Sequence, residues 1–423
     1  MIAGLDGVSF ATAKTGVFGR TRDNPRGDTV ENLDFLNLRK FAAPEFIFGL
    51  GAADLAGQYA VNYEVDRVLV VTDPGVITAG WAQSVMDSLA RAGASVVLFS
   101  GVSENPRDYE VMEGAAVYAA EGCGAIVAVG GGSPMDLAKG VGIVSANGGH
   151  ILDYEGADKV PIPCPPLICL PTTAGTGAEV SQFAIITDTA RRVKIAIVSK
   201  TTIPDVALID PKLTTTMDAK LTAHTGLDAL THAVEAYVSN ASSPITDMFA
   251  LSAVRRAGRH LAKAMARPND MIQRGGMCLA SLEAGLAFSN AILGAVHAMA
   301  HSLGGYLDLP HGECNAILLP HVMAANYDFA PERFDAIAVA LGVRPDGPGG
   351  LNGLDASGRK QALVGAVNDL KHSAGVTRGL SDLGVSRADI ANLAAKAVLD
   401  PCMLTNPTTL SLEEVEEIYA RAL

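Results

Sequence analysis

Three apolar runs, each followed by a helical pattern, constrain the fold of this chain more than any other feature. The runs VLVV, VVLF and AIVAV begin at residues 68, 96 and 125. They are continuously apolar and do not alternate with polar residues, so both faces of each strand are expected to be buried. Helical patterns such as WAQSVMDSLARAGA follow them. The alternation predicts a parallel sheet covered on both faces, whose ligands bind at the carboxyl ends of the strands.

The pattern changes near residues 213–220. From there to the C-terminus Ala-rich helical periodicity dominates and strand runs vanish, so we expect a second, all-α domain. We place the α/β domain at residues 37–216 and the helical domain at residues 217–423. Residues 1–36 are polar with weak periodicity, and we interpret them as an extension or an oligomer arm.

Composition argues against several partners and compartments. The net charge of −13 disfavours nucleic acid and anionic membranes as partners. The N-terminus has no apolar core behind basic residues, and no window of about 18 residues is apolar without charge or histidine, so neither a signal peptide nor a transmembrane helix is expected. Six cysteines without zinc-ribbon spacing are expected to be free thiols in a reducing compartment. A cytoplasmic enzyme is the expectation.

The first candidate ligand contact is Asp73, directly after the first strand run. A carboxylate there accepts hydrogen bonds from an adenosine ribose and disfavours a 2′-phosphate, which favours NAD over NADP. The alternative is an aspartate that only begins the Asp-Pro-Gly turn.

The second candidate is the segment GGGSPMDLAK at residues 130–139. Its glycines let backbone N–H groups approach a pyrophosphate at a helix N-terminus. Ser133 is expected to cap the helix, with Pro134 at a first helical position. The predicted phosphate contacts are Gly130, Gly131, Gly132 and Ser133. A structural turn is the alternative, because the segment is neither GxGxxG nor a P-loop.

A third segment, PTTAGTGAEVS, begins at residue 171 and follows another apolar run. Thr172 and Thr173 offer hydroxyls, and the glycines beside them offer backbone N–H groups, so the segment suits a second cofactor wall. Lys194 lies in the apolar strand run VKIAIVS. It is either a strand-edge residue or a further cofactor contact.

Residues 226–312 hold a cluster of metal-ligand types. Asp228 and His232 are four residues apart, and so are His297 and His301, while His311 follows a Leu-Pro break and is expected in a loop. Residues four apart share one face of a helix. A carboxylate with three imidazoles suits Fe²⁺ or Zn²⁺, and the remaining histidine is free for proton transfer. Each histidine alone is more often a satisfied core residue, but the set would be costly to bury without a cation.

These segments resemble the iron-containing (group III) alcohol dehydrogenase family, which includes lactaldehyde reductase and 1,3-propanediol dehydrogenase. The resemblance rests on GGGSPMDLAK, PTTAGTGAEVS, GLDALTHAVEAY and VHAMAHSLGGYLDLPHGECNAILLPHV, in the expected order. It implies a homo-oligomeric enzyme with an α/β N-terminal dinucleotide-binding domain, an all-α C-terminal metal-binding domain and a metal between them. This is also the general architecture of dehydroquinate synthase.

The resemblance also assigns roles to individual residues. The implied metal ligands, for Fe²⁺ or alternatively Zn²⁺, are Asp228, His232, His297 and His311. The implied NAD contacts are Asp73, Gly130, Gly131, Gly132, Ser133, Thr172, Thr173 and Lys194. His301 falls near the nicotinamide. Residues 1–36 have no counterpart in the family, and Phe183 stands where some relatives carry a polar residue near the substrate.

The hypothesis that follows is reversible hydride transfer between a primary alcohol or diol and NAD, with the alkoxide on a divalent metal. His301 would relay the released proton. Glu235 would orient His232, unless it is an exposed helix residue. Alternatives are a hydroxyacid-oxoacid transhydrogenase with bound NAD, a lyase of the dehydroquinate synthase type, and a catalytically silent NAD sensor.

Overall fold

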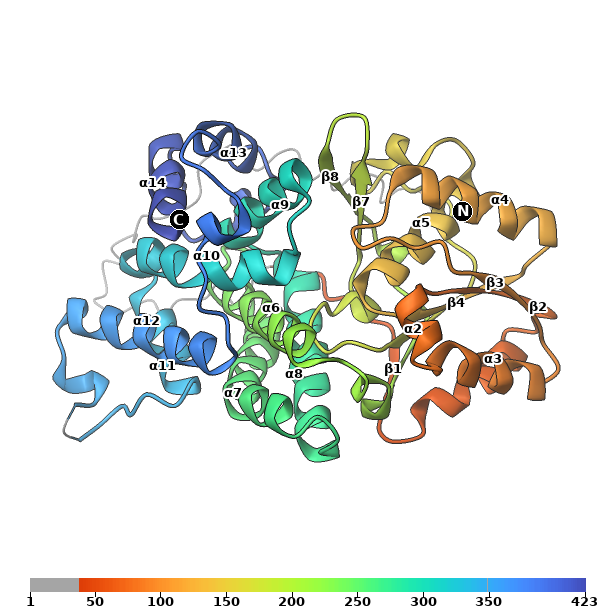
Figure 1. The fold of residues 1–423 in the computed structure, drawn as a ribbon, viewed down its shortest axis with the longest axis horizontal. Coiled ribbons are helices and arrows are strands. Elements are labelled where there is room, and N and C mark those ends of the chain that lie inside the picture. Colours follow the sequence, from red (N-terminus) through yellow and green to blue (C-terminus); the bar gives the residue numbers. More distant parts are fainter. Residues whose placement is uncertain (1–37, 348) are drawn as a thin grey trace, which may run out of the picture. The chain divides into compact units, whose positions relative to one another are not determined.

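The computed structural model describes residues 38–347 and 349–423 and contains a six-stranded parallel sheet (Figure 1). The strand order is β1-β9-β6-β4-β2-β3, and every neighbouring pair is parallel. The strands are β1 (Glu45–Phe48), β2 (Arg67–Val71), β3 (Ser95–Phe99), β4 (Ala125–Gly130), β6 (Leu167–Pro171) and β9 (Val206–Ile209). The predicted parallel sheet is therefore confirmed.

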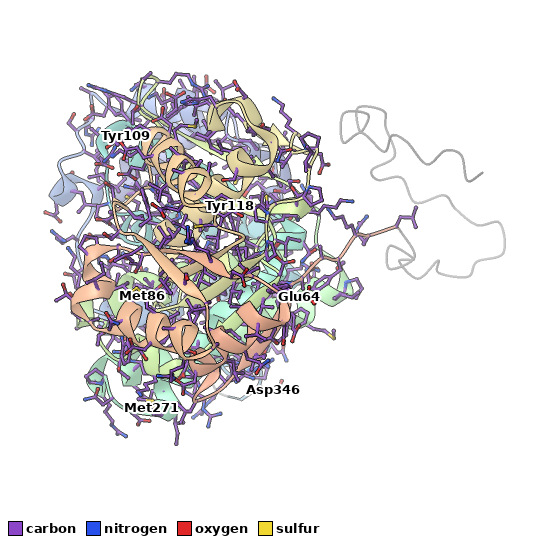
Figure 2. The ribbon with its side chains drawn as sticks, turned by 90° about the vertical axis from the view of Figure 1, so that its right-hand side faces the viewer. Glu64, Met86, Tyr109, Tyr118, Met271 and Asp346 are labelled. Carbon is purple, nitrogen blue, oxygen red and sulfur yellow. The ribbon has the colours of Figure 1, made fainter. Side chains whose placement is uncertain are left out.

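Helices cover both faces of this sheet, as the continuously apolar strands require. In β2, Val68 and Val70 pack with the helices of one face, and Leu69 and Val71 pack with those of the other. Figure 2 shows α4 and α3, which carry the labelled Tyr118 and Met86, on opposite sides of the strands. The helices of this region are α1 (Ala56–Asn62), α2 (Pro74–Thr78), α3 (Trp81–Arg91), α4 (Asp108–Glu121) and α5 (Gly132–Asn147).

A second, three-stranded sheet was not predicted. It contains β5 (Gly156–Ala157), β7 (Phe183–Asp188) and β8 (Val193–Val198), and β7 and β8 form an antiparallel hairpin. The turn is closed by Asp188, whose Oδ1 accepts the backbone N–H groups of Ala190 and Arg191. Sequence reasoning found β8 as a strand but did not predict its pairing with β7, because no Asn-Gly or Asp-Gly pair marks this turn.

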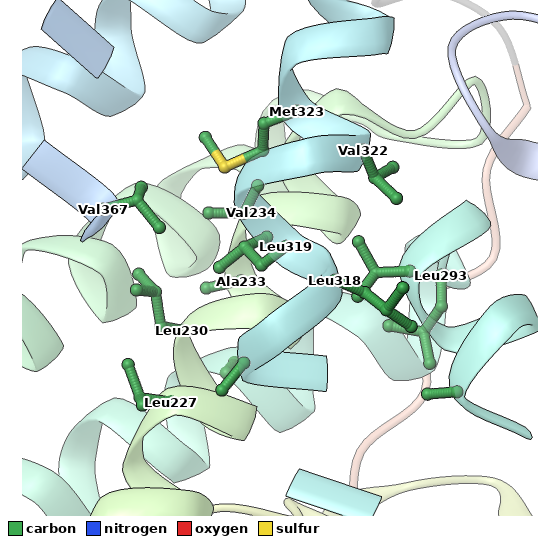
Figure 3. Packing of buried hydrophobic residues seen from close by; sticks show 14 of the residues in the cluster. Leu227, Leu230, Ala233, Val234, Leu293, Leu318, Leu319, Val322, Met323 and Val367 are labelled. Atoms are coloured by element: carbon green, nitrogen blue, oxygen red, sulfur yellow. The ribbon is translucent and has the colours of Figure 1, made fainter. Parts of the chain in front are cut away.

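After β9, the described residues form only helices. Their bounds are α6 (Ala219–Val238), α7 (Pro244–Ala266), α8 (Met271–Ala291), α9 (Ala295–Leu307), α10 (His311–Asn326), α11 (Pro331–Ala340), α12 (Ala356–Ser373), α13 (Ile390–Ala397) and α14 (Leu412–Ala422). Figure 3 shows α6 and α10 packing through side chains such as Leu230 and Leu319, with Val367 of α12 beside them. The expected combination of a parallel α/β region and a helical C-terminal region is confirmed. The boundary between residues 216 and 217 remains a prediction.

Three further expectations bear on the fold. Residues 1–36, interpreted as an extension, lie outside the described residues. All six cysteines are free thiols, as expected. In the described part of the chain no helix is by itself long and apolar enough to cross a membrane; α8 and α9 reach that length and composition only as a pair bent by 98°.

Candidate active site

Helix α6 brings the first two predicted ligands together. Asp218 caps its N-terminus by accepting the backbone N–H of Leu221 at 2.7 Å. Ten and fourteen residues along the chain, Asp228 and His232 lie on one buried face, with Nε2 of the imidazole 4.0 Å from Oδ1 of the carboxylate. The predicted i, i+4 pairing is therefore present in the structure.

The other histidines come from α9 and α10. His297 and His301 are one turn apart on α9, and a break follows in which Asp308 has a φ of 53°. His311 was expected in a loop, but it is the first residue of α10. The expectation failed because Pro310 ends the break immediately before that helix, where its fixed φ is compatible with the helix start.

The imidazoles of His297 and His311 join Asp228 on the buried face. Oδ1 of Asp228 lies 3.7 Å from Nε2 of His297 and 3.8 Å from Nε2 of His311, and one ligand atom from each of these three residues lies within 4.8 Å of the others. Ligands about 2.1 Å from one tetrahedral ion are roughly 3.4 Å apart. Asp228, His297 and His311 therefore need only a small contraction to hold one ion, and His232 approaches the same carboxylate oxygen at 4.0 Å.

The outer nitrogens of two imidazoles contact fixed oxygens. Nδ1 of His232 lies 3.2 Å from the carbonyl oxygen of Gly175, and Nδ1 of His297 lies 2.5 Å from Oε2 of Glu235. A proton on each Nδ1 leaves the Nε2 lone pair facing Asp228. Glu235, predicted to orient His232, instead contacts His297, and its Oε1 accepts the backbone N–H of Val296. The geometry fits a metal with imidazole and carboxylate ligands.

Charge and burial shape the protonation of this cluster. Burial opposes ionisation of Asp228, but the neighbouring histidines hold the pKa of its carboxyl well below its usual range. Burial lowers the pKa of His232 to about 4. For His297 burial acts in the same direction, but Glu235 and Asp228 outweigh it and raise the pKa to about 9. Asp228 is thus a buried anion beside a neutral His232, while the carboxylates of Glu235 and Asp228 favour the charged form of His297.

Asn315 is a residue of this cluster that sequence reasoning missed. It is fully buried on α10, and its Nδ2 lies 2.7 Å from Oδ1 of Asp228 and 3.0 Å from Nε2 of His297. It lies one turn after His311, whose Nε2 is 3.1 Å from the same amide nitrogen. The i, i+4 spacing from His311 was the available signal. One amide nitrogen thus lies within 3.1 Å of an atom from each of Asp228, His297 and His311.

His301 lies beside the cluster and has a carboxylate partner. Its ring is stacked on that of His311 with centroids 5.4 Å apart, and its Nδ1 is 2.9 Å from Oδ2 of Asp400. The pKa of Asp400 remains below its usual range, because His301 and hydrogen bonds from Cys402 outweigh the effect of burial. Asp400 lies 99 residues away in the chain, and nothing in the sequence connected the two.

The glycine segment lies at the carboxyl end of β4. A Cβ on Gly130 would come within 2.5 Å of Pro134, and one on Gly131 within 3.2 Å of Thr173. Ser133 was expected to cap the helix, but α5 begins at Gly132 and its N-cap is Gly131, so Ser133 lies within the first turn. Since α5 starts two residues before the proline, Pro134 is its third residue. The absence of side chains at Gly130 and Gly131 consequently lets Pro134 and Thr173 pack directly against the backbone of this turn.

The threonine segment connects the glycine turn to the metal-ligand cluster. The backbone N–H of Thr172 donates to the carbonyl of Gly130 at 2.9 Å, which joins the two predicted cofactor walls. Farther along, Gly175 packs on α6, where a Cβ would meet the backbone of Thr225 at 2.4 Å. The same glycine's carbonyl contacts His232. The two halves of the candidate site therefore share one loop.

The remaining predicted contacts lie at different places. Asp73 follows β2, which pairs in parallel with β4. It therefore lies at the same carboxyl end of the strands as Gly130. Its Oδ1 caps α2 by accepting the backbone N–H of Val76, the turn role that was the alternative interpretation. Lys194 reaches from β8 to α9, where a Cβ on Gly304 would lie 3.1 Å from its Nζ. Burial lowers the pKa of Lys194.

Models of a known protein family match most of the chain. Residues 43–211 match the family model described as iron-containing alcohol dehydrogenase. Residues 222–423 match the model described as the C-terminal part of the Fe-containing alcohol dehydrogenase family. The resemblance to this family is therefore confirmed.

Individual proteins show the same similarity over nearly their whole length. A 1,3-propanediol dehydrogenase from Citrobacter freundii is 41% identical over 377 residues, which cover 89% of this chain and 96% of that protein. The NAD-dependent methanol dehydrogenase of Bacillus methanolicus is 37% identical, with 90% and 99% covered, and the lactaldehyde reductase of Escherichia coli is 37% identical, with 89% and 97% covered. A crystal structure of a 1,3-propanediol oxidoreductase superposes with a TM-score of 0.88 at 39% identity, covering 92% of this chain and all of the other.

Proposed function

This chain belongs to the iron-containing alcohol dehydrogenase family, and we propose that it catalyses reversible hydride transfer between a primary alcohol or diol and NAD. One observation carries the proposal: three imidazole Nε2 atoms face Oδ1 of Asp228 at 3.7 to 4.0 Å. The experiment below tests it through metal-dependent formation of NADH.

The metal ligands would be Asp228, His232, His297 and His311. We propose Fe²⁺ as the ion, with Zn²⁺ as a possible substitute, because both accept imidazole and carboxylate ligands. When bound, the ion would supply Lewis acidity that polarises the carbon–oxygen bond of the substrate. Glu235 would keep His297 in the ligating tautomer, since its carboxylate accepts the proton on Nδ1.

The nucleotide would bind along the glycine turn and the threonine segment. Backbone N–H groups at the start of α5 face a pyrophosphate in such turns, and the helix N-terminus favours its negative charge. We propose Gly130, Gly131, Gly132 and Ser133 for this contact. The second wall would consist of Thr172, Thr173 and Lys194. Asp73 would bind the adenosine ribose through Oδ2, because its Oδ1 already caps α2.

His301 would move the proton that alcohol oxidation releases. Its Nδ1 contacts Asp400, so Nε2 is the nitrogen free to accept a proton from the substrate side. The carboxylate would stabilise the imidazolium that forms and hold the ring in one orientation. Asp400 is thus a positioning residue for the proton transfer.

Aromatic side chains adjoin the ligands and bear on the substrate. Phe288 stacks on His232 with centroids 4.4 Å apart, and Phe183 lies 5.9 Å from Phe288. We propose that these rings form one wall of the substrate site and favour small alcohols with an apolar carbon chain. Phe183→Asn should then raise kcat/KM for 1,2-diols relative to 1-propanol, and an unchanged ratio would contradict the proposal.

We also propose a homo-oligomer that works in the cytoplasm on a small alcohol or aldehyde, with no nucleic-acid or membrane partner. The edge strand β1 leaves Phe46 and Phe48 partly exposed, at 42% and 36%. Exposed apolar edge strands are prone to pair with another chain. Six free thiols suit a reducing compartment, and the net charge of −13 disfavours polyanionic partners.

The decisive experiment measures NADH formation by metal-stripped protein. The protein is reconstituted anaerobically with Fe²⁺ or Zn²⁺ in parallel and assayed across short primary alcohols and diols, with His297→Ala as the control. We expect metal-dependent NADH production that disappears in the variant. If the protein binds NAD and metal tightly but forms no NADH from any alcohol, simple alcohol oxidation is refuted.

That negative outcome would favour one of the other two reactions. A transhydrogenase would keep its NAD bound and turn over only when a second carbonyl substrate accepts the hydride. A lyase of the dehydroquinate synthase type would turn over its substrate without net NADH.

A further inference from the structure

A second cluster of metal-ligand side chains lies on the far side of His301. Nδ1 of His301, a carboxylate oxygen of Asp400 and Sγ of Cys402 all lie within 4.8 Å of one another. We propose that these three residues form a second cation site, selective for a thiophilic divalent ion of the Zn²⁺ class. The first candidate site, formed by Asp228 and three histidines, contains no sulfur.

The local backbone places two of the three side chains. Asp400 is the N-cap of the short helix η11 (Pro401–Thr405), and its Oδ1 accepts the backbone N–H of Cys402 at 2.8 Å. This capping turn places the side chains of Asp400 and Cys402 close to each other and to His301 of α9. His301 on α9 meets them with its Nδ1 2.9 Å from Oδ2 of Asp400.

The turn is fixed independently of these contacts. Oγ1 of Thr405 donates to the carbonyl of Leu293 at 2.5 Å, just before α9 begins. Oδ1 of Asn406 accepts the backbone N–H of Ala295, the first residue of that helix, at 3.2 Å. Because η11 and the start of α9 are tied together in this way, the three donor groups are arranged before any ion arrives. Such preorganisation lowers the entropic cost of binding.

The donor set selects the ion. Thiolate, imidazole and carboxylate together suit Zn²⁺, Co²⁺ or Cd²⁺, whereas Mg²⁺ and Ca²⁺ prefer oxygen alone. Binding requires Cys402 to release its thiol proton, and His301 to shift its proton from Nδ1 to Nε2 so that Nδ1 can bind. The present contact between Nδ1 and Oδ2 must widen by a few tenths of an ångström, toward the roughly 3.4 Å between ligands of one tetrahedral ion.

The consequence for catalysis follows from the position of His301, and this step rests on the proposed function. The ring lies between the two sites, with its centroid 5.4 Å from that of His311 and 5.9 Å from that of His297. An ion on Nδ1 would end the contact with Asp400 and fix a proton on Nε2. His301 could then no longer accept a proton from the alcohol. Occupation of the second site should therefore inhibit alcohol oxidation.

Cobalt distinguishes the two sites because only the second contains a thiolate. Protein carrying one equivalent of Zn²⁺ is titrated with Co²⁺, and the near-ultraviolet thiolate-to-cobalt charge-transfer band is recorded. We expect a band that saturates at one further equivalent. Cys402→Ser should abolish the band, while Cys314→Ser, a change at another buried cysteine near the first site, should preserve it.

Asp400→Asn provides a second variant that retains the thiol. It should raise the Co²⁺ concentration at half-saturation about tenfold, because the amide is a weaker ligand than the carboxylate. Circular dichroism and the first equivalent of Zn²⁺ report whether each variant is folded. A folded wild-type protein with no band, or a band that persists in Cys402→Ser, overturns the cation site.

Inhibition is measured separately as NADH formation against added Zn²⁺. Beyond the first equivalent, the rate should fall about tenfold or more in the wild type and much less in Cys402→Ser, since proton transfer by a side chain contributes that much or more. A cobalt band without inhibition would refute the regulatory consequence and leave the cation site supported. A band in protein that forms no NADH at all would refute the proposed function and not the second site.

Discussion

The glycine turn and the metal-ligand cluster meet in one loop, but they are built in opposite ways. The turn at residues 130–132 carries no side chains, and an added Cβ there would come within 2.5 to 3.2 Å of a neighbour. The metal-ligand cluster is built from side chains on α6, α9 and α10, and two of its imidazoles have outer partners, the carbonyl of Gly175 for His232 and the carboxylate of Glu235 for His297. We therefore expect the glycine turn to be sensitive to added side-chain atoms and the metal-ligand cluster to be sensitive to the loss of side-chain atoms.

The largest effect is expected from loss of a metal ligand. His297→Ala should lower metal-dependent NADH formation by about 1000-fold or more, because the ion loses a buried ligand and the substrate loses its Lewis acid. NAD binding, followed by fluorescence, should change little, since the glycine turn does not contain this residue. A variant that keeps full metal content and turnover would show that His297 is not a ligand.

The reciprocal change adds one methyl group to the glycine turn. Gly130→Ala should weaken NAD binding about tenfold or more, because the new Cβ forces the backbone away from Pro134 and out of position for the pyrophosphate. Metal content should stay at the wild-type level. Gly365→Ala is the control, since its Cβ would meet nothing within 4 Å. Equal NAD affinity in both variants would argue that the turn is only structural.

A smaller effect is expected from Glu235, which contacts the candidate ligand His297 but would not bind the ion itself. Glu235→Gln keeps the size of the side chain but removes the charge that faces Nδ1 of His297, so metal affinity should fall about 10- to 100-fold. Competition with a chelator measures it. Glu283→Gln, which disturbs only an ion pair with Arg256, is the matched control. If both variants hold metal alike, Glu235 contributes nothing specific to the site.

The smallest effect concerns Glu179, which lies in the threonine segment that the two regions share, and it depends on pH. Burial raises the pKa of Glu179 to about 7, above its ordinary 4.5. Between these values the folded state binds more protons than the unfolded state, so the free energy of unfolding falls as pH rises, by about 3 kcal/mol at most. Glu179→Gln should remove this part of the pH dependence in urea unfolding from pH 5 to 8. Glu121→Gln, at an exposed position, should retain it; identical curves for all three proteins would contradict the assignment.

The difference between the two regions also explains what could be predicted. Buried parallel strands and paired helical residues are local patterns, so the sheet, the helical region and the pairs Asp228/His232 and His297/His301 could be predicted from sequence alone. The resemblance added the ligand set and the NAD contacts by position. The β7–β8 hairpin and the helical start at His311 were not predicted, because their turns lack a distinctive local signal.

The sequence by itself determined which residues have ligand chemistry and which of them share a face of one helix. Only the tertiary structure decided the partners that fix them. Glu235 faces His297 and not His232, Asp400 faces His301 from 99 residues away, and Asn315 lies among the ligand atoms. The physical reason is distance along the chain. Helical periodicity relates residues three or four apart, whereas packing between helices brings together residues that no short-range pattern connects.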